Sequence, residues 1–193
     1  MGAGAKKMET VRAFLAIELS ENVRQKIVEL GKEIVMTGAD VKPVEFDNLH
    51  LTLKFLGDVS IESVDKIHQA MKNVKSKKFD LEARGTGVFP NVHMARVLWI
   101  GVGKGGEESI SIFRQLEGQL SKMGFPAERD FTPHITIARV KSARNREGLI
   151  NAMERNRDTV FGETRVEKFV LKKSVLTPSG PIYSKLREVE LEP

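Results

Sequence analysis

Hydrophobic and polar positions follow two different periods along the chain. Residues 11–19 (VRAFLAIEL) form a largely apolar run that is typical of a strand. A helix is predicted next, between Ser20, which can cap its start, and Gly38, which can end it. Its apolar positions recur at helical spacing and are Val23, Ile27, Leu30 and Ile34.

The same alternation of strands and helices continues to the end of the chain. The further predicted strands are 41–46, 49–56, 79–89, 95–102, 134–140, 166–176 and 182–191. Three further helices are predicted, one starting at Ser60, one over 107–123 and one over 146–156. Turn residues at 89–91 (FPN) and 177–181 (TPSGP) join pairs of strands. The resulting order, βαββαββαβαββ, predicts an α+β protein without a long linker.

One short pattern occurs on two of these strands, as HLTL at 50–53 and HITI at 134–137. Each copy follows a helix and its connection, so we interpret the fold as an approximate duplication. Side chains alternate between the faces of a strand, so His50 and Thr52 should share one face, and so should His134 and Thr136. If the two strands are neighbours, two imidazoles and two hydroxyls face one cleft.

This set of groups suits the cleavage of a phosphodiester. Displacement at phosphorus needs a base to deprotonate the attacking oxygen and an acid to protonate the leaving oxygen. Histidine can serve in either role near neutral pH. Threonine hydroxyls can bind the non-bridging phosphate oxygens as neutral donors. Lys54 has the same strand parity as His50 and is expected to add positive charge to the cleft.

A single copy of such a pattern would be weak support for function, because a strand often starts with histidine near threonine. The chain has only four histidines, and two of them in the same pattern should occur by chance on the order of 10⁻⁴ of the time. The other two, His68 within a predicted helix and His93 in a turn, are interpreted as structural or solvated.

Composition narrows the class of protein. The 193 residues include no cysteine, which excludes disulfides, thiolate zinc sites and cysteine nucleophiles and favours a cytoplasmic location. No apolar run approaches the roughly 18 residues of a membrane span. The net charge of +5 and the pI near 9.4 favour a polyanionic partner such as RNA. The abundance of lysine and glutamate favours a thermophilic source, because such proteins are rich in surface ion pairs. Residues 1–8 (MGAGAKKM) are expected to form a flexible extension, and 9–193 a single domain.

Four stretches together resemble the 2H phosphoesterase superfamily, in particular the RNA 2′,3′-cyclic phosphodiesterases that are also called 2′-5′ RNA ligases. They are RAFLAIEL, HLTLKFLG, GVFPNVHMARVLWIGV and FTPHITIARV. The resemblance implies a bilobal, duplicated fold in which two antiparallel-rich sheets surround a central cleft and helices pack on the outside. It also implies hydrolysis of a terminal cyclic phosphate on RNA, such as a tRNA fragment, to a 2′-phosphate. The resemblance further implies weak reverse ligation and no metal or other cofactor. We expect the protein to be a monomer.

The resemblance further assigns roles that the residues alone leave open. It implies that His50 is the general acid, that His134 is the general base and that Arg139 binds phosphate. Arg139 has the wrong parity for the cleft face of an ideal strand. A bulge or the end of the strand must turn it inward, or it is an ordinary surface arginine. Arg96 could contact phosphate or only flank a buried strand, and Phe89, near a turn, could stack on a nucleobase.

Three other interpretations have to be weighed. GVGKGG at 101–106 fits the GxGxxG pattern of a dinucleotide-binding loop, but Glu107 and Glu108 occupy the helix start where a pyrophosphate would bind. We therefore expect a connecting loop. An RNA-binding module that keeps the cleft without turnover would show no reaction rate. A histidine metal site would lose activity in a chelator.

Overall fold

The computed structural model describes residues 9–193, and the extension expected over residues 1–8 lies outside the described residues. Its strands are β1 (Thr10–Glu18), β2 (Val41–Pro43), β3 (His50–Ser60), β4 (Phe79–Phe89), β5 (Val97–Val102), β6 (His134–Val140), β7 (Val160–Val166), β8 (Lys168–Thr177) and β9 (Gly180–Glu190). Its α-helices are α1 (Glu21–Met36), α2 (Ile61–Lys72), α3 (Gly106–Leu120) and α4 (Arg146–Arg155). Short 3₁₀ turns cover Phe46–Asn48, Val92–Met94 and Ser121–Met123.

The first two helices begin where serine follows a strand. The Ser20 hydroxyl accepts a hydrogen bond from the backbone N–H of Val23, and the Ser60 hydroxyl accepts one from that of Ser63. Each bond satisfies one of the backbone donors that the first turn of a helix leaves free. Both starts agree with the sequence prediction. The buried face of α1 also consists of the predicted positions, Val23, Ile27, Leu30 and Ile34.

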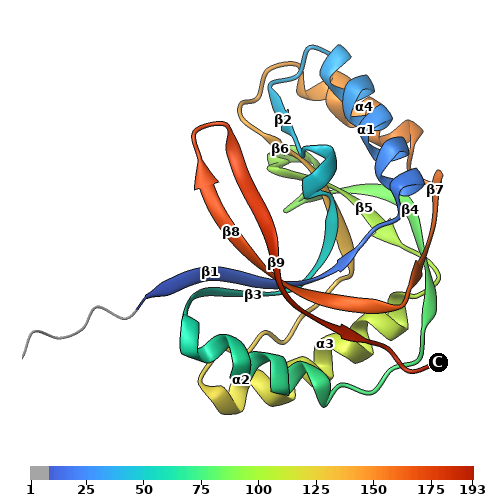
Figure 1. Ribbon diagram of the computed structural model, residues 1–193. Helices are drawn as coiled ribbons and strands as arrows, with labels where there is room; N and C mark the ends of the chain where they lie inside the picture. The colour runs from blue at the N-terminus through green and yellow to red at the C-terminus, as the bar shows by residue number, and fades with distance from the viewer. Residues whose placement is uncertain (1–8) are drawn as a thin grey trace, which may run out of the picture.

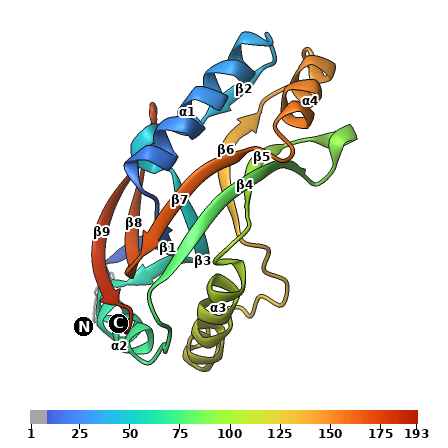
Figure 2. The ribbon, with the colours of Figure 1, turned by 90° about the vertical axis from the view of Figure 1, so that its right-hand side faces the viewer.

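The strands form one hydrogen-bonded sheet in the order β7-β4-β5-β6-β3-β1-β8-β9, with β2 added to β6. Its neighbouring strands are antiparallel. The two halves of this sheet meet between β3 and β6, where the register contains the single pair Leu51 and Ile135. The two predicted sheets are therefore two lobes of a continuous, curled sheet (Figures 1 and 2).

The strand order is nearly symmetric about this junction. β6, β5, β4 and β7 on one side correspond to β3, β1, β8 and β9 on the other. The helices also occupy equivalent places, because α1 and α3 follow β1 and β5, while α2 and α4 follow β3 and β6. Figures 1 and 2 show α1 and α4 together at one end of the molecule and α2 and α3 at the other. This arrangement is the duplicated α+β fold expected from the two motifs.

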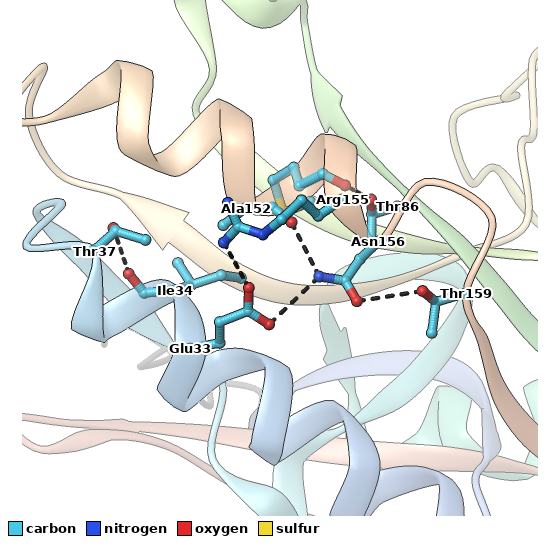
Figure 3. A network of polar contacts seen from close by, with 9 residues as sticks. Glu33, Ile34, Thr37, Thr86, Ala152, Arg155, Asn156 and Thr159 are labelled. Atoms are coloured by element: carbon cyan, nitrogen blue, oxygen red, sulfur yellow. Dashed lines mark hydrogen bonds and ion pairs between the residues drawn. The ribbon is translucent and has the colours of Figure 1, made fainter.

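A polar network holds α4 against α1 (Figure 3). The Arg155 guanidinium donates to a carboxylate oxygen of Glu33 over 2.8 Å, and the Asn156 amide donates to the other oxygen over 3.4 Å. The Thr86 hydroxyl of β4 donates to the carbonyl of Met153 in α4 over 2.6 Å. These bonds join α1, α4 and β4 into one supported lobe.

Two parts of the predicted order need correction. β7 was not predicted, because its buried residues do not alternate regularly: Phe161 bulges out of the register with β4, and Gly162 has a φ of 124°. The strand predicted over 41–46 ends at Pro43. Proline has no N–H to donate to a ladder, and a 3₁₀ turn starts at Phe46.

Candidate active site

β3 and β6 bring the two histidine motifs together at the junction of the lobes. Leu51 pairs with Ile135 in antiparallel register, so His50 lies across from Thr136 and Thr52 lies across from His134. In such a ladder, residues on the diagonal of one face are roughly 7–8 Å apart. The two histidines occupy such a diagonal on one face of the sheet.

Two adjoining cavities lie over this junction. One has a volume of about 260 Å³ and is lined by His50 and Tyr183, among others. The second has a volume of about 390 Å³ and is lined by His134 and Phe89, among others. Both cavities share the same four residues, Thr52, Phe55, Thr136 and Arg139. We call the two cavities together the cleft, and its centre contains both threonines.

The backbone fixes the orientation of both imidazoles. His50 Nδ1 lies 2.7 Å from the carbonyl oxygen of Asn48, and His134 Nδ1 lies 2.7 Å from that of Thr132. A carbonyl can only accept, so Nδ1 carries the proton in both residues. In the neutral rings, Nε2 is then the free base. His50 Nε2 lies 2.9 Å from the Thr52 hydroxyl, while His134 Nε2 has no hydrogen-bond partner within residues 9–193.

The two histidines differ in their surroundings. Burial, together with the nearby Lys172 ammonium, lowers the pKa of His50 to about 4, against the opposing effects of the Asn48 carbonyl and Glu18. Lys172 donates to the Glu18 carboxylate over 2.8 Å, and Glu18 pairs with His50 across β1 and β3. His50 is therefore neutral at pH 7 in the ligand-free cleft.

Aromatic rings flank each imidazole. The rings of Phe14 and Tyr183 have their centroids 4.9 and 5.5 Å from that of His50. The rings of Phe89 and Trp99 lie 5.0 and 6.4 Å from that of His134. Phe89 thus lies in the cleft beside His134, where the sequence analysis placed a candidate for base stacking. Contact with a base stays a prediction.

A β-bulge at the last residue of each histidine motif changes which of the following side chains face the cleft. Along β6, Thr136 pairs with Trp99 and Ala138 with Leu98, so Ile137 is the extra residue. The bulge restores Arg139 to the cleft side, where it lines both cavities. A bulge was one of the two features expected to turn Arg139 toward the cleft.

The equivalent bulge in β3 has the opposite effect on Lys54. Thr52 pairs with Ala16 and Lys54 with Leu15, so Leu53 is the extra residue. Lys54 is turned away from the motif face and is only 2% exposed. Its ammonium forms ion pairs with Glu117 and Glu128 and donates to the carbonyl of Pro126 over 2.8 Å.

The expectation that Lys54 adds free positive charge to the cleft is therefore wrong. It lines the edge of the larger cavity, but its charge is compensated by two carboxylates. The next residue, Phe55, faces the cleft in its place and is 64% exposed. Phe55 was missed as a site residue. The repeat contained the signal, because Phe55 and Arg139 both stand five residues after the histidine of their motif.

Tyr183 and Asn48 also line the cleft. Neither was predicted, because they come from segments far apart in the chain. Burial raises the pKa of Tyr183, so its hydroxyl is neutral near pH 7 and can donate into the cleft. The Asn48 amide donates to the carbonyl of Pro181 over 2.9 Å, and Lys42 donates to that of Ser179 over 3.1 Å. These bonds hold the β8–β9 turn over the His50 side of the cleft.

The remaining candidates lie outside the cleft. Arg96 lines neither of its cavities and instead borders a separate groove beside Arg139. His68 lies on α2 with Nε2 3.2 Å from the Glu188 carbonyl, and His93 lies in an exposed 3₁₀ turn. Both positions agree with the structural or solvated interpretation.

The glycine-rich segment before α3 is a connecting loop. The Gly103 N–H donates to the Glu82 carbonyl, and the Glu82 N–H donates to the Lys104 carbonyl, so the loop is bound to β4. Within residues 9–193, no three His, Asp or Glu side chains are grouped so that they could hold a metal ion. None of the helices described over this range has the length and apolar character needed to cross a membrane.

Curated relatives match nearly the whole chain. A protein of Methanothermobacter thermautotrophicus is 39% identical over 183 residues, covering 94% of this chain and 99% of the relative. One from Methanocaldococcus jannaschii is 39% identical over 178 residues, covering 92% and 99%. Both relatives bear the name RNA 2′,3′-cyclic phosphodiesterase. Relatives from thermophiles are common among the matches.

Solved structures share the fold. Escherichia coli LigT complexed with 3′-AMP superposes with a TM-score of 0.78 at 27% identity, covering 95% of this chain and 99% of that one. A Thermus thermophilus protein, TT0787, superposes with a TM-score of 0.76 at 31% identity, covering 93% and 97%. The family described as LigT-like phosphoesterase matches twice, over residues 17–99 and 100–183, one match for each half of the duplication. The chain belongs to the LigT-like phosphoesterases of the 2H superfamily.

Proposed function

We propose that the protein is an RNA 2′,3′-cyclic phosphodiesterase that opens a terminal cyclic phosphate to a 2′-phosphate without a metal ion. The observation that carries this proposal is the register of β3 and β6, which sets two histidines with equally fixed tautomers on one face. The names of the relatives support the same reaction class.

In the proposed reaction, water attacks phosphorus and the bond from phosphorus to O3′ breaks. Nε2 of His134 takes the proton of the water, and protonated Nε2 of His50 gives a proton to O3′. The products are a 2′-phosphate and a free 3′-hydroxyl. Thr52, Thr136 and Arg139 surround the site of the phosphate and can donate to its non-bridging oxygens. Arg139 can do so with two parallel bonds.

The low pKa of His50 sets a condition on this assignment. A general acid must carry the proton, but the ligand-free imidazole is neutral at pH 7. A bound cyclic phosphate has one negative charge, and an opposite charge within about 4–6 Å shifts a pKa by 1–3 units toward the charged form. Substrate binding would therefore raise the pKa of His50 to roughly 5–7, so that a fraction of His50 carries the proton near neutral pH.

One assay tests the reaction and its regiochemistry together. The purified protein is incubated with an oligoribonucleotide that ends in a 2′,3′-cyclic phosphate, and the product is analysed by phosphorus NMR. The proposal predicts a 2′-phosphate. A 3′-phosphate would mean that O2′, and not O3′, is the leaving oxygen. An unchanged substrate would instead support the alternative, an RNA-binding module without turnover.

Metal independence is tested by chelation. Hydrolysis is expected to continue unchanged in excess EDTA after dialysis. A loss of activity that zinc or manganese restores would instead support a histidine metal site.

The finer points of the proposal concern the substrate and the reverse reaction. We expect the RNA to come from cleavage that leaves cyclic ends, as in tRNA fragments, in the cytoplasm, with the protein acting as a monomer. In hydrolysis the attacking group is water. Ligation is therefore expected only when the 5′-hydroxyl of a second RNA attacks phosphorus in place of water. An excess of 5′-hydroxyl oligonucleotide should reveal a small amount of 2′-5′-joined product.

A further inference from the structure

A basic groove adjoins the cleft beside Arg139. Its volume is about 590 Å³, and its cationic lining consists of Arg96, Arg139, Lys141 and Arg146. The lining contains no carboxylate. Arg139 also lines both cavities of the cleft, so the groove adjoins the cleft at this residue.

The charges of the groove are not compensated by the protein. In the described part of the chain, none of its four cations belongs to an ion pair. Arg146 is also the first residue of α4, where the partial positive charge of the helix disfavours a cation. Its Nη1 donates to the His93 carbonyl over 2.5 Å, while its buried Nε has no partner. Like charges held together at such a place are unfavourable unless an anion binds.

The equivalent segment of the other lobe is acidic rather than basic. The segment after the first motif, residues 57–62, is GDVSIE and contains two acids and no cation. The equivalent segment after the second motif, residues 141–146, is KSARNR and contains three cations and no acid. The duplicated halves thus agree at the histidines and threonines but differ in the charge of the segments that follow them. Only the segment after the second motif could attract an anion beside the cleft.

We propose that this groove binds the phosphodiester backbone of the RNA strand that precedes the cyclic phosphate. The inference rests on the proposed function and adds the surface that binds the rest of the strand, so that an RNA oligomer is preferred to a 2′,3′-cyclic mononucleotide. The terminal phosphate lies at Arg139, and the next phosphates of the same strand follow the groove past Arg96 and Arg146. Contacts of this kind hold the backbone in place and carry no sequence preference.

The test compares two substrates in one variant. Arg96→Gln and Arg146→Gln are combined, since neither residue lines the cleft, and kcat/KM is measured for a cyclic-phosphate oligonucleotide and for 2′,3′-cyclic AMP. The value for the oligonucleotide should fall on the order of tenfold at moderate salt, while that for the mononucleotide changes less than twofold. The salt dependence of the oligonucleotide reaction should weaken by about 0.7 in logarithmic slope for each RNA phosphate that the variant no longer neutralises.

A matched control removes exposed cations elsewhere. Lys66→Gln on α2 and Arg114→Gln on α3 remove two positive charges, as the groove variant does, and neither residue is in a described ion pair. This variant should keep the oligonucleotide preference. An equal loss in the control would mean that net charge alone attracts RNA and would overturn the proposal.

A single substitution and a binding assay complete the test of the groove. Arg96→Gln alone serves if the change at Arg146 disturbs α4, because the Arg96 side chain is exposed. An unchanged preference, or an equal fall for both substrates, would overturn the groove assignment. If the wild type hydrolyses neither substrate, the proposed function fails separately. Fluorescence anisotropy with an oligonucleotide ending in a 2′-phosphate would then still decide whether the groove variants weaken binding.

Discussion

At the scale of single residues, the two histidines share their orientation but not their environment. Both donate Nδ1–H to the carbonyl of the residue two positions before them, which is a property of the repeated motif. Burial and Lys172 lower the pKa of His50. The sequence could predict the shared geometry from the pattern itself. It could not predict the difference, because Lys172 and Glu18 come from other strands.

The pKa of His50 gives the first prediction. Proton NMR of the imidazole carbons should show a pKa near 4 in the free protein and a rise of about 1–3 units when 3′-AMP binds in the cleft. The negative charge of the nucleotide stabilises the imidazolium. A pKa that stays near 4 with the nucleotide bound would contradict the role of His50 as general acid.

The same shift predicts how stability depends on pH. The pKa of His50 is about 4 in the folded protein and near 6.5 when unfolded, so the unfolded chain binds more protons between these values. The free energy of unfolding should therefore fall as the pH is lowered from 6.5 to 4, by up to about 3 kcal/mol from this residue. Urea unfolding of His50→Gln should show a smaller loss over this window. Equal losses in the variant and the wild type would contradict the shift.

At the scale of elements, two equivalent bulges decide which residues face the cleft. The hydrophobic pattern predicted most strands and helices within a few residues, because their buried faces follow the periods of 2 and 3.6. It failed where an extra residue interrupts the period. Leu53 and Ile137 are such residues, and they account for the wrong placement of Lys54 and the omission of Phe55. A bulge cannot be inferred from alternation, since it is a break in alternation.

The buried position of Lys54 gives a prediction about stability rather than activity. Lys54→Met leaves Glu117 buried without its partner and should cost about 3–5 kcal/mol in urea unfolding. The paired change Lys54→Met and Glu117→Leu removes both charges and should recover most of this loss. Hydrolysis of 2′,3′-cyclic AMP should stay within about threefold of the wild type. A stable single variant with a large rise in KM would restore the role of Lys54 in the cleft.

At the scale of the whole molecule, the cleft depends on contacts between distant parts of the chain. One residue pair joins the lobes at β3 and β6, and the β8–β9 turn reaches across to β2 and to the 3₁₀ turn at Phe46–Asn48. The repeated motif predicted the junction. The turn was predicted only as a link between strands, and nothing in its composition indicated that it covers the cleft.

The contact of this turn with Asn48 can be tested alone. Asn48→Ala removes the bond to the Pro181 carbonyl but keeps the backbone carbonyl that orients His50. Hydrogen exchange should become faster in the β8–β9 turn, and KM should rise a few-fold with little change in kcat. An unchanged exchange rate would show that the turn is held by other contacts.

The central claim is that two histidines at one junction divide the proton transfers between them. The most direct measurement is the turnover of a cyclic-phosphate oligonucleotide by His50→Ala and His134→Ala, with circular dichroism to show that both are folded. Each substitution should lower kcat about 10²- to 10⁴-fold or more. A folded variant that keeps near wild-type turnover, at either position, would contradict the account.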